Sequence, residues 1–240
     1  MMGLMTQTLR AAIVTGAGSG IGRETACLLA REGFALTLAS RTVSTLEETA
    51  ARLGDAQVHL RPTDLADSDD AQQLVHDAVA RWGRLDALIN VAGTASLGPI
   101  DTVTSENWRS CIDTNLSSVV LTTAAAWPTF TRQQSGIVVN ISSMASFDPF
   151  PGLAMYAAAK VGVNLFTRCT ADEGKAINVQ ALAIAPGAVE TPMLRSLFSE
   201  DQLPRDKALA PSDIASAICN CITGRQTFES GQTLVMDSPH

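Results

Sequence analysis

The stretch AAIVTGAGSGIG, residues 11–22, places a short apolar run directly before a turn that contains four glycines. Residues 23–32, which follow the turn, carry apolar side chains at helical spacing. Glycine permits positive φ angles and lets an anion approach the amide groups at the start of a helix, where unpaired N–H groups and the helix dipole favour negative charge. The stretch therefore predicts a strand, a turn and a helix that bind the phosphates of a cofactor.

The glycine spacing from Gly16 to Gly22 is Gly-x3-Gly-x-Gly, which differs from the Gly-x-Gly-x2-Gly of the common dinucleotide fingerprint. A glycine-rich turn can also be no more than a tight connection between a strand and a helix. Because this one motif does not separate the two interpretations, the decision depends on the rest of the chain.

Apolar runs alternate with helical patterns along the remaining chain. After a first strand at residues 11–15, strands are predicted at residues 34–39, 57–61, 85–91, 136–142, 179–185 and 232–236. Helices are predicted at residues 23–32, 43–53, 68–82, 105–127, 155–168 and 211–221. This alternation predicts an α/β fold, a doubly wound, Rossmann-type parallel sheet of seven strands with helices on both faces. Residues 10–240 are expected to form this single domain after a variable or disordered N-terminus, residues 1–9.

The composition is that of a compact chain with one substantial core. Of the 240 residues, 46% are hydrophobic and 17% are charged. No run of about 18 apolar residues occurs and the N-terminus lacks the blocks of a signal peptide, so we expect a cytoplasmic protein. The net charge of −7 provides no basic footprint for nucleic acid or an anionic membrane. The expected partners are small molecules and copies of the same chain.

The cysteines are scattered, odd in number and mostly surrounded by apolar residues at helical spacing, which is typical of reduced thiols in a core. They are Cys27, Cys111, Cys169, Cys219 and Cys221. Cys219 and Cys221 form a Cys-x-Cys without a second pair or a nearby histidine. No metal site is predicted.

Tyr156 is the only tyrosine in the chain, and Lys160 follows it by four residues in a run rich in alanine. This spacing predicts that the two side chains lie on one face of a helix. A neighbouring ammonium lowers the pKa of a phenol from its reference value of about 10, which would let Tyr156 donate or accept a proton near neutral pH. The alternative is an amphipathic helix with a packed tyrosine and a solvated lysine.

Residues that follow the second and third predicted strands indicate how the adenosine end of a cofactor would be recognised. In dinucleotide folds an acid at the tip of the second strand suits a free 2′-hydroxyl, and an arginine suits a 2′-phosphate. Here Ser40 and Arg41 occupy that tip, so NADP(H) is favoured over NAD(H), with a plain surface charge as the alternative for Arg41. Asp64, after the third strand, could accept from an adenine amino group or organise its own loop.

The chain resembles the short-chain dehydrogenase/reductases from Arg10 to Asp237. The resemblance depends on several separate motifs in the family's order: Thr15-Gly16-x3-Gly20-x-Gly22, Asp64, Asn90-x-Ala92-Gly93, Asn115, Ser143, Tyr156-x3-Lys160, and Pro186-Gly187 followed by Thr191. Two positions depart from the family pattern. Val91 stands where the family commonly repeats asparagine, and the glycine turn lacks the basic residue that many NADP-preferring members carry.

The resemblance implies a catalytic tetrad of Asn115, Ser143, Tyr156 and Lys160. Tyr156 would be the general acid for carbonyl reduction and the base for alcohol oxidation. Lys160 would lower the pKa of Tyr156 and hold the nicotinamide ribose, and Ser143 would hydrogen-bond the substrate oxygen. Asn115 would kink its helix and hold a water that links Lys160 to solvent. A buried asparagine in the middle of a helix also suggests by itself a structural or chemical role, because its amide has to be hydrogen-bonded.

The resemblance also implies a cofactor site along one edge of the sheet, where Thr191 and the backbone of Val189 would face the nicotinamide carboxamide. The residues expected to bind the cofactor are Gly16, Ser19, Gly20, Ile21, Gly22, Ser40, Arg41, Asp64, Leu65, Asn90, Ala92, Gly93, Tyr156, Lys160, Pro186, Gly187, Val189 and Thr191.

Three segments are expected to contact substrate: the loop after Gly93, residues 144–155 and residues 188–207. The first two are mostly apolar, and Asp148 is their one charge. Their apolar residues are Leu97, Met144, Phe147, Phe150, Leu153 and Met155. They predict a small, neutral, fairly apolar ketone or secondary alcohol. A segment from Pro192 to Phe198 is expected to form a lid over bound cofactor.

Two alternative functions remain. The first is a 3-oxoacyl-[acyl-carrier-protein] reductase, which the resemblance suggests, although Gln134 and Asp172 stand where such enzymes usually carry basic residues for the acidic carrier. The second is an NADP-binding regulator that has lost catalysis, which the intact tetrad argues against. Family analogy further implies a homotetramer, or a homodimer, in which the helices that begin near residues 105 and 155 pack across a two-fold axis.

Overall fold

The computed structural model describes residues 9–239, so nearly all of the predicted variable N-terminus, residues 1–9, lies outside the described residues. Seven parallel strands form one sheet in the order β3-β2-β1-β4-β5-β6-β7. They are β1 (Arg10–Thr15), β2 (Phe34–Ser40), β3 (Val58–Pro62), β4 (Ala87–Asn90), β5 (Gly136–Ile141), β6 (Val179–Pro186) and β7 (Thr233–Met236). The chain moves outward from β1 to one edge and then crosses to the other half, which is the predicted doubly wound arrangement.

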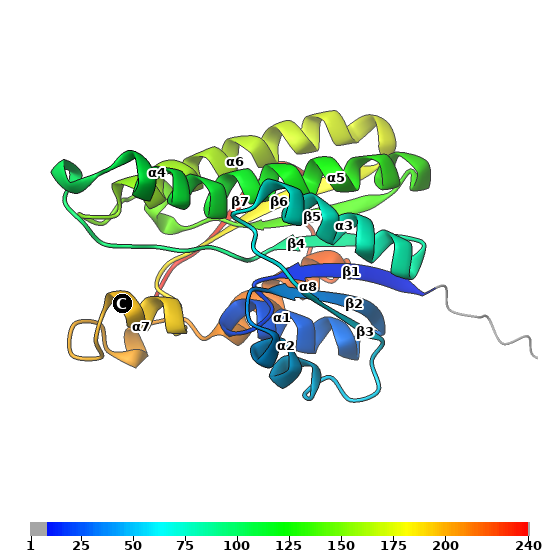
Figure 1. Ribbon diagram of the computed structural model, residues 1–240, viewed down its shortest axis with the longest axis horizontal. Coiled ribbons are helices and arrows are strands. Elements are labelled where there is room, and N and C mark those ends of the chain that lie inside the picture. Colours follow the sequence, from blue (N-terminus) through cyan, green and yellow to red (C-terminus); the bar gives the residue numbers. More distant parts are fainter. Residues whose placement is uncertain (1–8, 240) are drawn as a thin grey trace, which may run out of the picture.

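Helices cover both faces of the sheet (Figure 1). One face carries α1 (Gly20–Arg31), α2 (Val43–Ala50) and α8 (Pro211–Ile222). The other carries α3 (Ser68–Trp82), α4 (Ser105–Ile112), α5 (Ser118–Gln133) and α6 (Ala154–Gly174). A short helix, α7 (Pro192–Leu197), stands apart from both layers beyond the ends of the strands. The predicted α/β class, strand number and two-sided helix layers are confirmed.

The core is divided by the sheet into two apolar layers, because successive side chains of a strand point to opposite faces. In β1, Val14 packs into the layer under α1 and α8, whereas Ile13 packs into the layer under α3 and α5. The central strands are apolar almost throughout, as expected of parallel strands that are buried on both faces. The sheet therefore holds the ends of its strands rigidly in register.

The predicted helix over residues 105–127 is interrupted and extended in the structure. A π-helical turn, Asp113–Ser117, separates α4 from α5, and α5 continues through Pro128 to Gln133. Pro128 lies on the exposed side, so water can solvate the carbonyl that its ring deprives of a partner. The fully buried Phe130 fixes the last turns of the helix to the core, which overrides the local preference of proline to end a helix.

Two smaller expectations also change. The α6 helix runs to Gly174 and not to residue 168, because Thr170, Ala171 and Gly174 are buried against the sheet. Among the cysteines, Cys111, Cys219 and Cys221 are buried, whereas Cys169 is exposed on the outer side of α6. The prediction that the cysteines are core thiols is therefore wrong for Cys169. No helix among residues 9–239 is both long and apolar enough to cross a membrane.

Candidate active site

The carboxyl ends of β1, β2, β4, β5 and β6 open onto one cavity of about 960 Å³. This edge of a doubly wound sheet is where ligands bind in such folds. Most of the predicted cofactor-binding residues line the cavity: Gly16, Ser19, Gly20, Ile21, Ser40, Arg41, Asp64, Leu65, Ala92, Gly93, Tyr156, Lys160, Pro186, Gly187, Val189 and Thr191. Ser143 lines it too. Of the predicted residues, Gly22, Asn90 and Asn115 lie behind this surface.

The glycine turn brings the start of α1 to the cavity. Gly16 and Gly20 have φ angles of +64° and +50°, which favour glycine. A Cβ atom at Gly22 would lie 2.3 Å from the carbonyl oxygen of Gly16, so Gly22 serves the close packing of the turn on its helix and not the cavity wall. No side chain caps α1 and its first turn carries no acid, which leaves that end of the helix able to bind an anion.

The floor of the cavity, formed by the ends of β4 and β5 and by α6, is held by buried polar side chains. The Asn90 amide donates to Asn140 Oδ1 at 2.9 Å, and the Asn140 amide donates to Thr167 Oγ1 at 2.9 Å. The Thr122 hydroxyl donates to Asn90 Oδ1 at 3.0 Å. Asn90 and Asn140 pair directly across β4 and β5. Asn90 therefore positions the floor from behind.

Several residues of this floor were not predicted to have a role. Asn140, Thr122 and Thr167 complete the polar chain, and an asparagine in an otherwise apolar strand was the available signal for Asn140. Thr15 accepts from the backbone amides of Val91 and Ala92 at 2.9 and 3.1 Å, so it fixes the loop that follows β4. Each of these contacts joins segments distant in sequence, which is why local patterns did not reveal them.

Lys160 lies one turn after Tyr156 on α6, as predicted, with its Nζ atom 5.5 Å from the centre of the Tyr156 ring. The lysine is only 3% exposed, and its ammonium donates to the Ile141 carbonyl oxygen at 2.7 Å. The interpretation of Lys160 as a solvated lysine is therefore wrong. Burial lowers the pKa of Lys160 to about 8, because a charged group loses hydration there.

The expected effect of Lys160 on Tyr156 is not found. Burial raises the pKa of Tyr156 to about 12, and the nearby Ser143 hydroxyl only partly opposes this rise. The prediction that the ammonium lowers the phenol pKa is thus wrong, because loss of hydration is the largest effect on the phenol. At neutral pH the phenol is protonated.

Ser143 follows the carboxyl end of β5 and lies on the same wall as Tyr156. Its side-chain oxygen accepts from the backbone amide of Ala145 at 3.1 Å, which begins a short 3-10 turn and fixes the hydroxyl in place. Because the hydroxyl still has its own proton to donate, it can hydrogen-bond an oxygen atom that enters the cavity.

Asn115 occupies the π-helical turn between α4 and α5 and is fully buried. Its Oδ1 atom accepts from the Thr94 amide at 3.1 Å, and its Nδ2 atom donates to the carbonyl oxygens of Thr94 and Cys111 at 2.8 and 2.9 Å. The side chain therefore ties the loop after β4 to the helix. A Cβ atom at Gly93 would lie 2.8 Å from Asn115 Oδ1 and 3.7 Å from Lys160 Nζ, which requires glycine at that position.

The comparisons with known proteins agree with this geometry. A family model described as short chain dehydrogenase matches residues 10–202. The chain belongs to this family. It is 34% identical over 216 residues to an uncharacterized oxidoreductase of Staphylococcus aureus strain USA300, covering 90% of this chain and 92% of that protein.

Two further relatives of this short-chain dehydrogenase carry more specific names. A protein of Streptomyces violaceoruber, provisionally assigned as ketoacyl reductase 2 of the granaticin polyketide synthase, is 36% identical over 239 residues, with 94% of each chain covered. The crystal structure of levodione reductase superposes with a TM-score of 0.87 at 28% identity, covering 95% of this chain and 96% of that one. The protein is therefore an NAD(P)-dependent oxidoreductase of the short-chain dehydrogenase/reductase type.

The cavity of this dehydrogenase fits an NAD(P) cofactor. At Gly16 a Cβ atom would lie 3.0 Å from the backbone of Ala92, and at Gly20 it would lie 2.9 Å from Thr191 Cγ2. These glycines keep open a narrow cradle that any larger residue would fill. At the adenosine end, one Asp64 oxygen accepts from the Ala66 amide at 3.1 Å, so this carboxylate organises its loop and also lines the cavity.

The opposite end of the cavity has a mostly apolar wall. Met144, Phe150 and Leu153 line it as predicted. The predicted contributions of Leu97, Phe147 and Met155 are not found. None of these three residues lines the cavity. Met155 is next to Tyr156, but adjacent residues of a helix point in different directions.

The predicted lid over residues 192–198 forms the short helix α7, which Thr191 caps by accepting from the Leu194 amide at 3.2 Å.

Proposed function

We propose that this enzyme transfers a hydride between NADP(H) and a small, neutral, fairly apolar ketone or secondary alcohol, with Tyr156 as the general acid and base. The observation that supports the proposal is that Ser143, Tyr156 and Lys160 line the same cavity as the glycine turn. A cofactor bound at the turn and a carbonyl in the same cavity would then have a proton donor, a hydroxyl and a buried ammonium within the site.

The bound cofactor supplies the hydride, and the residues of the chain handle the proton. Tyr156, protonated at neutral pH, gives its proton to the carbonyl oxygen during reduction. Ser143 donates a hydrogen bond to the same oxygen as negative charge develops on it. Lys160 stays fixed by the Ile141 carbonyl with its Nζ atom 5.5 Å from the centre of the Tyr156 ring, where it would hold the nicotinamide ribose. Asn115 acts behind them by fixing the loop that holds Gly93.

The proposed preference for NADP(H) depends on Arg41. This residue is exposed at the adenosine end, and no ion pair among residues 9–239 includes it. By contrast, Arg23 beneath the turn forms an ion pair with Glu48 at 2.9 Å and therefore has a structural role. The Ser40 and Thr45 hydroxyls also line the cavity near this end, where both donate to the Thr42 carbonyl oxygen, at 3.3 and 2.8 Å.

The preference can be tested with Arg41→Ser. We expect KM for NADPH to rise about tenfold or more while KM for NADH changes little, because a charged hydrogen bond to phosphate is lost. Equal effects on both cofactors would argue that Arg41 is only a surface charge.

The substrate proposal is tested by assaying NADPH oxidation with simple apolar ketones and with acetoacetyl thioesters. Preference for a small ketone supports the proposal. Asp148 is the one charged side chain on the apolar wall, so anionic substrates should be disfavoured. A clear preference for a carrier-bound thioester would favour the first alternative instead.

That alternative, a 3-oxoacyl-[acyl-carrier-protein] reductase, is favoured by the name of the granaticin relative. The surface chemistry argues against it. Gln134 is exposed at the end of α5, and Asp172 forms an exposed ion pair with Lys175 at 2.7 Å. The expected cations for an acidic carrier are thus absent at these two positions. The remaining alternative, an NADP-binding regulator without catalysis, predicts that Tyr156→Phe would leave function intact.

We further propose that the enzyme is a homotetramer, or a homodimer, assembled through α4 to α6. Val161 and Leu165 on α6 are 50% and 58% exposed, which is unusual for large apolar side chains spaced four apart on one helix face. Sedimentation of the purified protein tests this proposal, and a monomer at micromolar concentration would contradict it.

A further inference from the structure

The segment from Pro192 to Leu203, called the lid below, covers the apolar end of the cavity. Seven of its residues line the cavity: Pro192, Met193, Leu194, Leu197, Phe198, Gln202 and Leu203. Its helix α7 has only six residues, and none of them is buried. A helix this short is not stable by itself in water, and no apolar core fixes it. Its position must therefore depend on other contacts.

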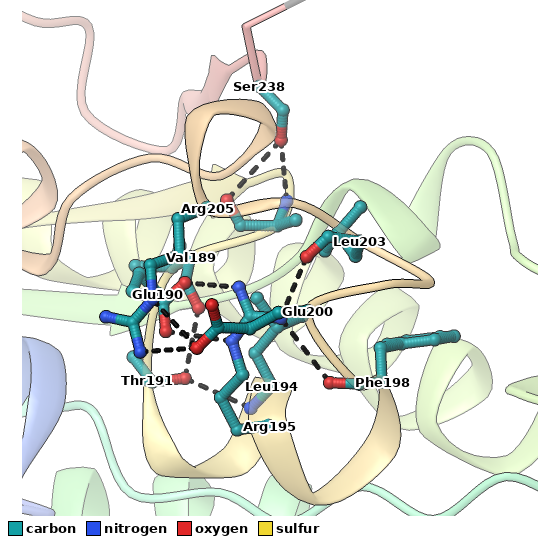
Figure 2. A network of polar contacts seen from close by, with 11 residues as sticks. Val189, Glu190, Thr191, Leu194, Arg195, Phe198, Glu200, Leu203, Arg205 and Ser238 are labelled. Carbon is teal, nitrogen blue, oxygen red and sulfur yellow. Dashed lines mark hydrogen bonds and ion pairs between the residues drawn. The ribbon is translucent and has the colours of Figure 1, made fainter.

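Arg195 supplies those contacts (Figure 2). Its Nε atom donates to Glu190 Oε1 at 2.9 Å, and a second guanidinium nitrogen donates to the other oxygen of the same carboxylate. Its remaining nitrogen donates to the carbonyl oxygen of Leu203 at 2.8 Å and more weakly to that of Phe198 at 3.5 Å. One side chain thus joins both ends of the lid to the residue that precedes Thr191.

The two partners of this ion pair are about four-fifths shielded from solvent, with 19% and 23% of the Arg195 and Glu190 side chains exposed. The hydrogen bond from Arg195 lowers the pKa of Glu190, so the carboxylate stays charged at neutral pH. Neither residue lines the cavity. Their ion pair therefore lies behind the cavity wall and does not touch a ligand in the cavity.

The lid meets the opposite wall through two aromatic rings. Phe198 packs edge-on against Phe150, with ring centres 5.5 Å apart and planes at 87°. Phe150 belongs to the segment between β5 and α6, so this contact closes the apolar end of the cavity. Because Arg195 holds the carbonyl groups of Phe198 and Leu203, it also fixes where the Phe198 ring lies.

We propose that Arg195 and Glu190 are positioning residues that hold the lid closed over the substrate, and so determine KM for the carbonyl compound more than kcat. Only the expected effect on KM and kcat rests on the proposed function. Glu190 lies between Val189 and Thr191, so the same ion pair links the lid to the segment proposed to face nicotinamide. Binding at that segment and ordering of the lid are therefore coupled.

The test compares Arg195→Gln with Arg205→Gln. Arg205 follows the lid and pairs with Glu200 of the lid, but both side chains of that pair are more than half exposed and the Arg205 side chain makes no bond to the carbonyls of Phe198 and Leu203. In Arg195→Gln we expect KM for the carbonyl compound to rise about tenfold with kcat changed less than about threefold, since the tyrosine wall is untouched. Glu190→Gln should act in the same direction, and Arg205→Gln should stay within about twofold of wild type.

Amide hydrogen exchange of the ligand-free variants gives a second readout that does not need activity. Amides of residues 192–203 should exchange faster in Arg195→Gln than in Arg205→Gln, with the sheet unchanged. Arg195→Lys should restore only part of the protection, because an ammonium cannot bond a carboxylate and two carbonyls in the guanidinium geometry. If Arg195→Gln matches Arg205→Gln in both KM and exchange, the proposal is overturned. Faster lid exchange in a protein that reduces no ketone would support the positioning role and overturn the proposed function alone.

Discussion

The floor of the cavity and the lid above it are fixed by different kinds of contact. On the floor, Asn90, Asn140 and Lys160 are at most 4% exposed, and each has a partner on a neighbouring strand or helix. On the lid no residue of α7 is buried, and one arginine makes most of the fixing contacts. The proposed catalytic residues thus lie on the packed core, whereas the proposed substrate lid has few buried contacts.

The first prediction tests whether the floor carries out catalysis. Tyr156→Phe removes the proton donor and keeps the ring, so turnover should fall between about 10²- and 10⁴-fold. The cofactor should still bind, because the phosphate cradle at α1 is untouched. Steady-state rates and cofactor fluorescence titrations measure the two effects. Retained turnover would show that another group supplies the proton.

The second prediction concerns the stability of the floor. Asn140→Ala removes two buried hydrogen bonds and leaves the Asn90 amide and the Thr167 hydroxyl without this partner. The free energy of unfolding should fall by about 1–3 kcal/mol. Gln180→Ala, at an exposed position of β6, is the matched control and should change it by less than about 0.5 kcal/mol. Urea unfolding of both variants provides the comparison, and equal stabilities would contradict a structural role for the buried chain.

The third prediction uses the shifted pKa values of the floor. Lys160 is charged below its pKa of about 8 and neutral above it, while Tyr156 stays protonated up to about 12. If the ammonium is required, the rate of reduction should be constant at neutral pH and fall about tenfold per pH unit above 8. A rate independent of pH up to 10 would exclude a need for the lysine charge.

Tyr156 offers a direct check of the same values, because it is the only tyrosine. Ultraviolet absorbance should report a single phenol that ionises near pH 12 in the ligand-free protein and not near its reference value of about 10. Ionisation below 10 would show that Lys160 acidifies the phenol even without cofactor.

The smallest expected effect lies on the lid. Phe198→Ala removes the ring that packs on Phe150, a contact of a type worth about 0.5–1.5 kcal/mol. KM for the carbonyl compound should rise by about two- to twelvefold, with little change in unfolding free energy because neither ring is in the core. Phe147→Ala, at an exposed ring outside the cavity, is the control. If Phe198→Ala lowered the free energy of unfolding as much as Asn140→Ala, the floor and the lid would not differ in how much they contribute to stability.

The sequence was a good guide where a function needs a fixed local pattern. The glycine turn, the Tyr-x3-Lys spacing and the helix at Ser68–Trp82 all depend on residues close together in the chain, and the structure has each of them. It was a poor guide to the surroundings of each side chain. Burial has the largest effect on the pKa values of Tyr156 and Lys160. The burial of Lys160 follows from packing against β5 and could not be inferred from the helix alone.

The same limit explains the helix that includes Asn115. Its apolar pattern predicted one continuous helix, and only the family resemblance implied a kink at Asn115. The bonds between Asn115 and Thr94 join the loop after β4 to a π-helical turn. The spacing of side chains in this stretch, taken alone, favours a continuous helix. The tertiary contact to Thr94 lies outside any window of helical periodicity.

The sequence by itself determined the order of strands and helices, the glycine turn and the Tyr156-x3-Lys160 spacing, because each follows from side-chain spacing and glycine conformation over a few residues. Only the tertiary structure decided which of those residues face the cavity, how burial shifts their pKa values, and that Arg195 fixes the lid. These properties depend on distances between segments far apart in the chain, which are set when the sheet and its two helical layers pack together.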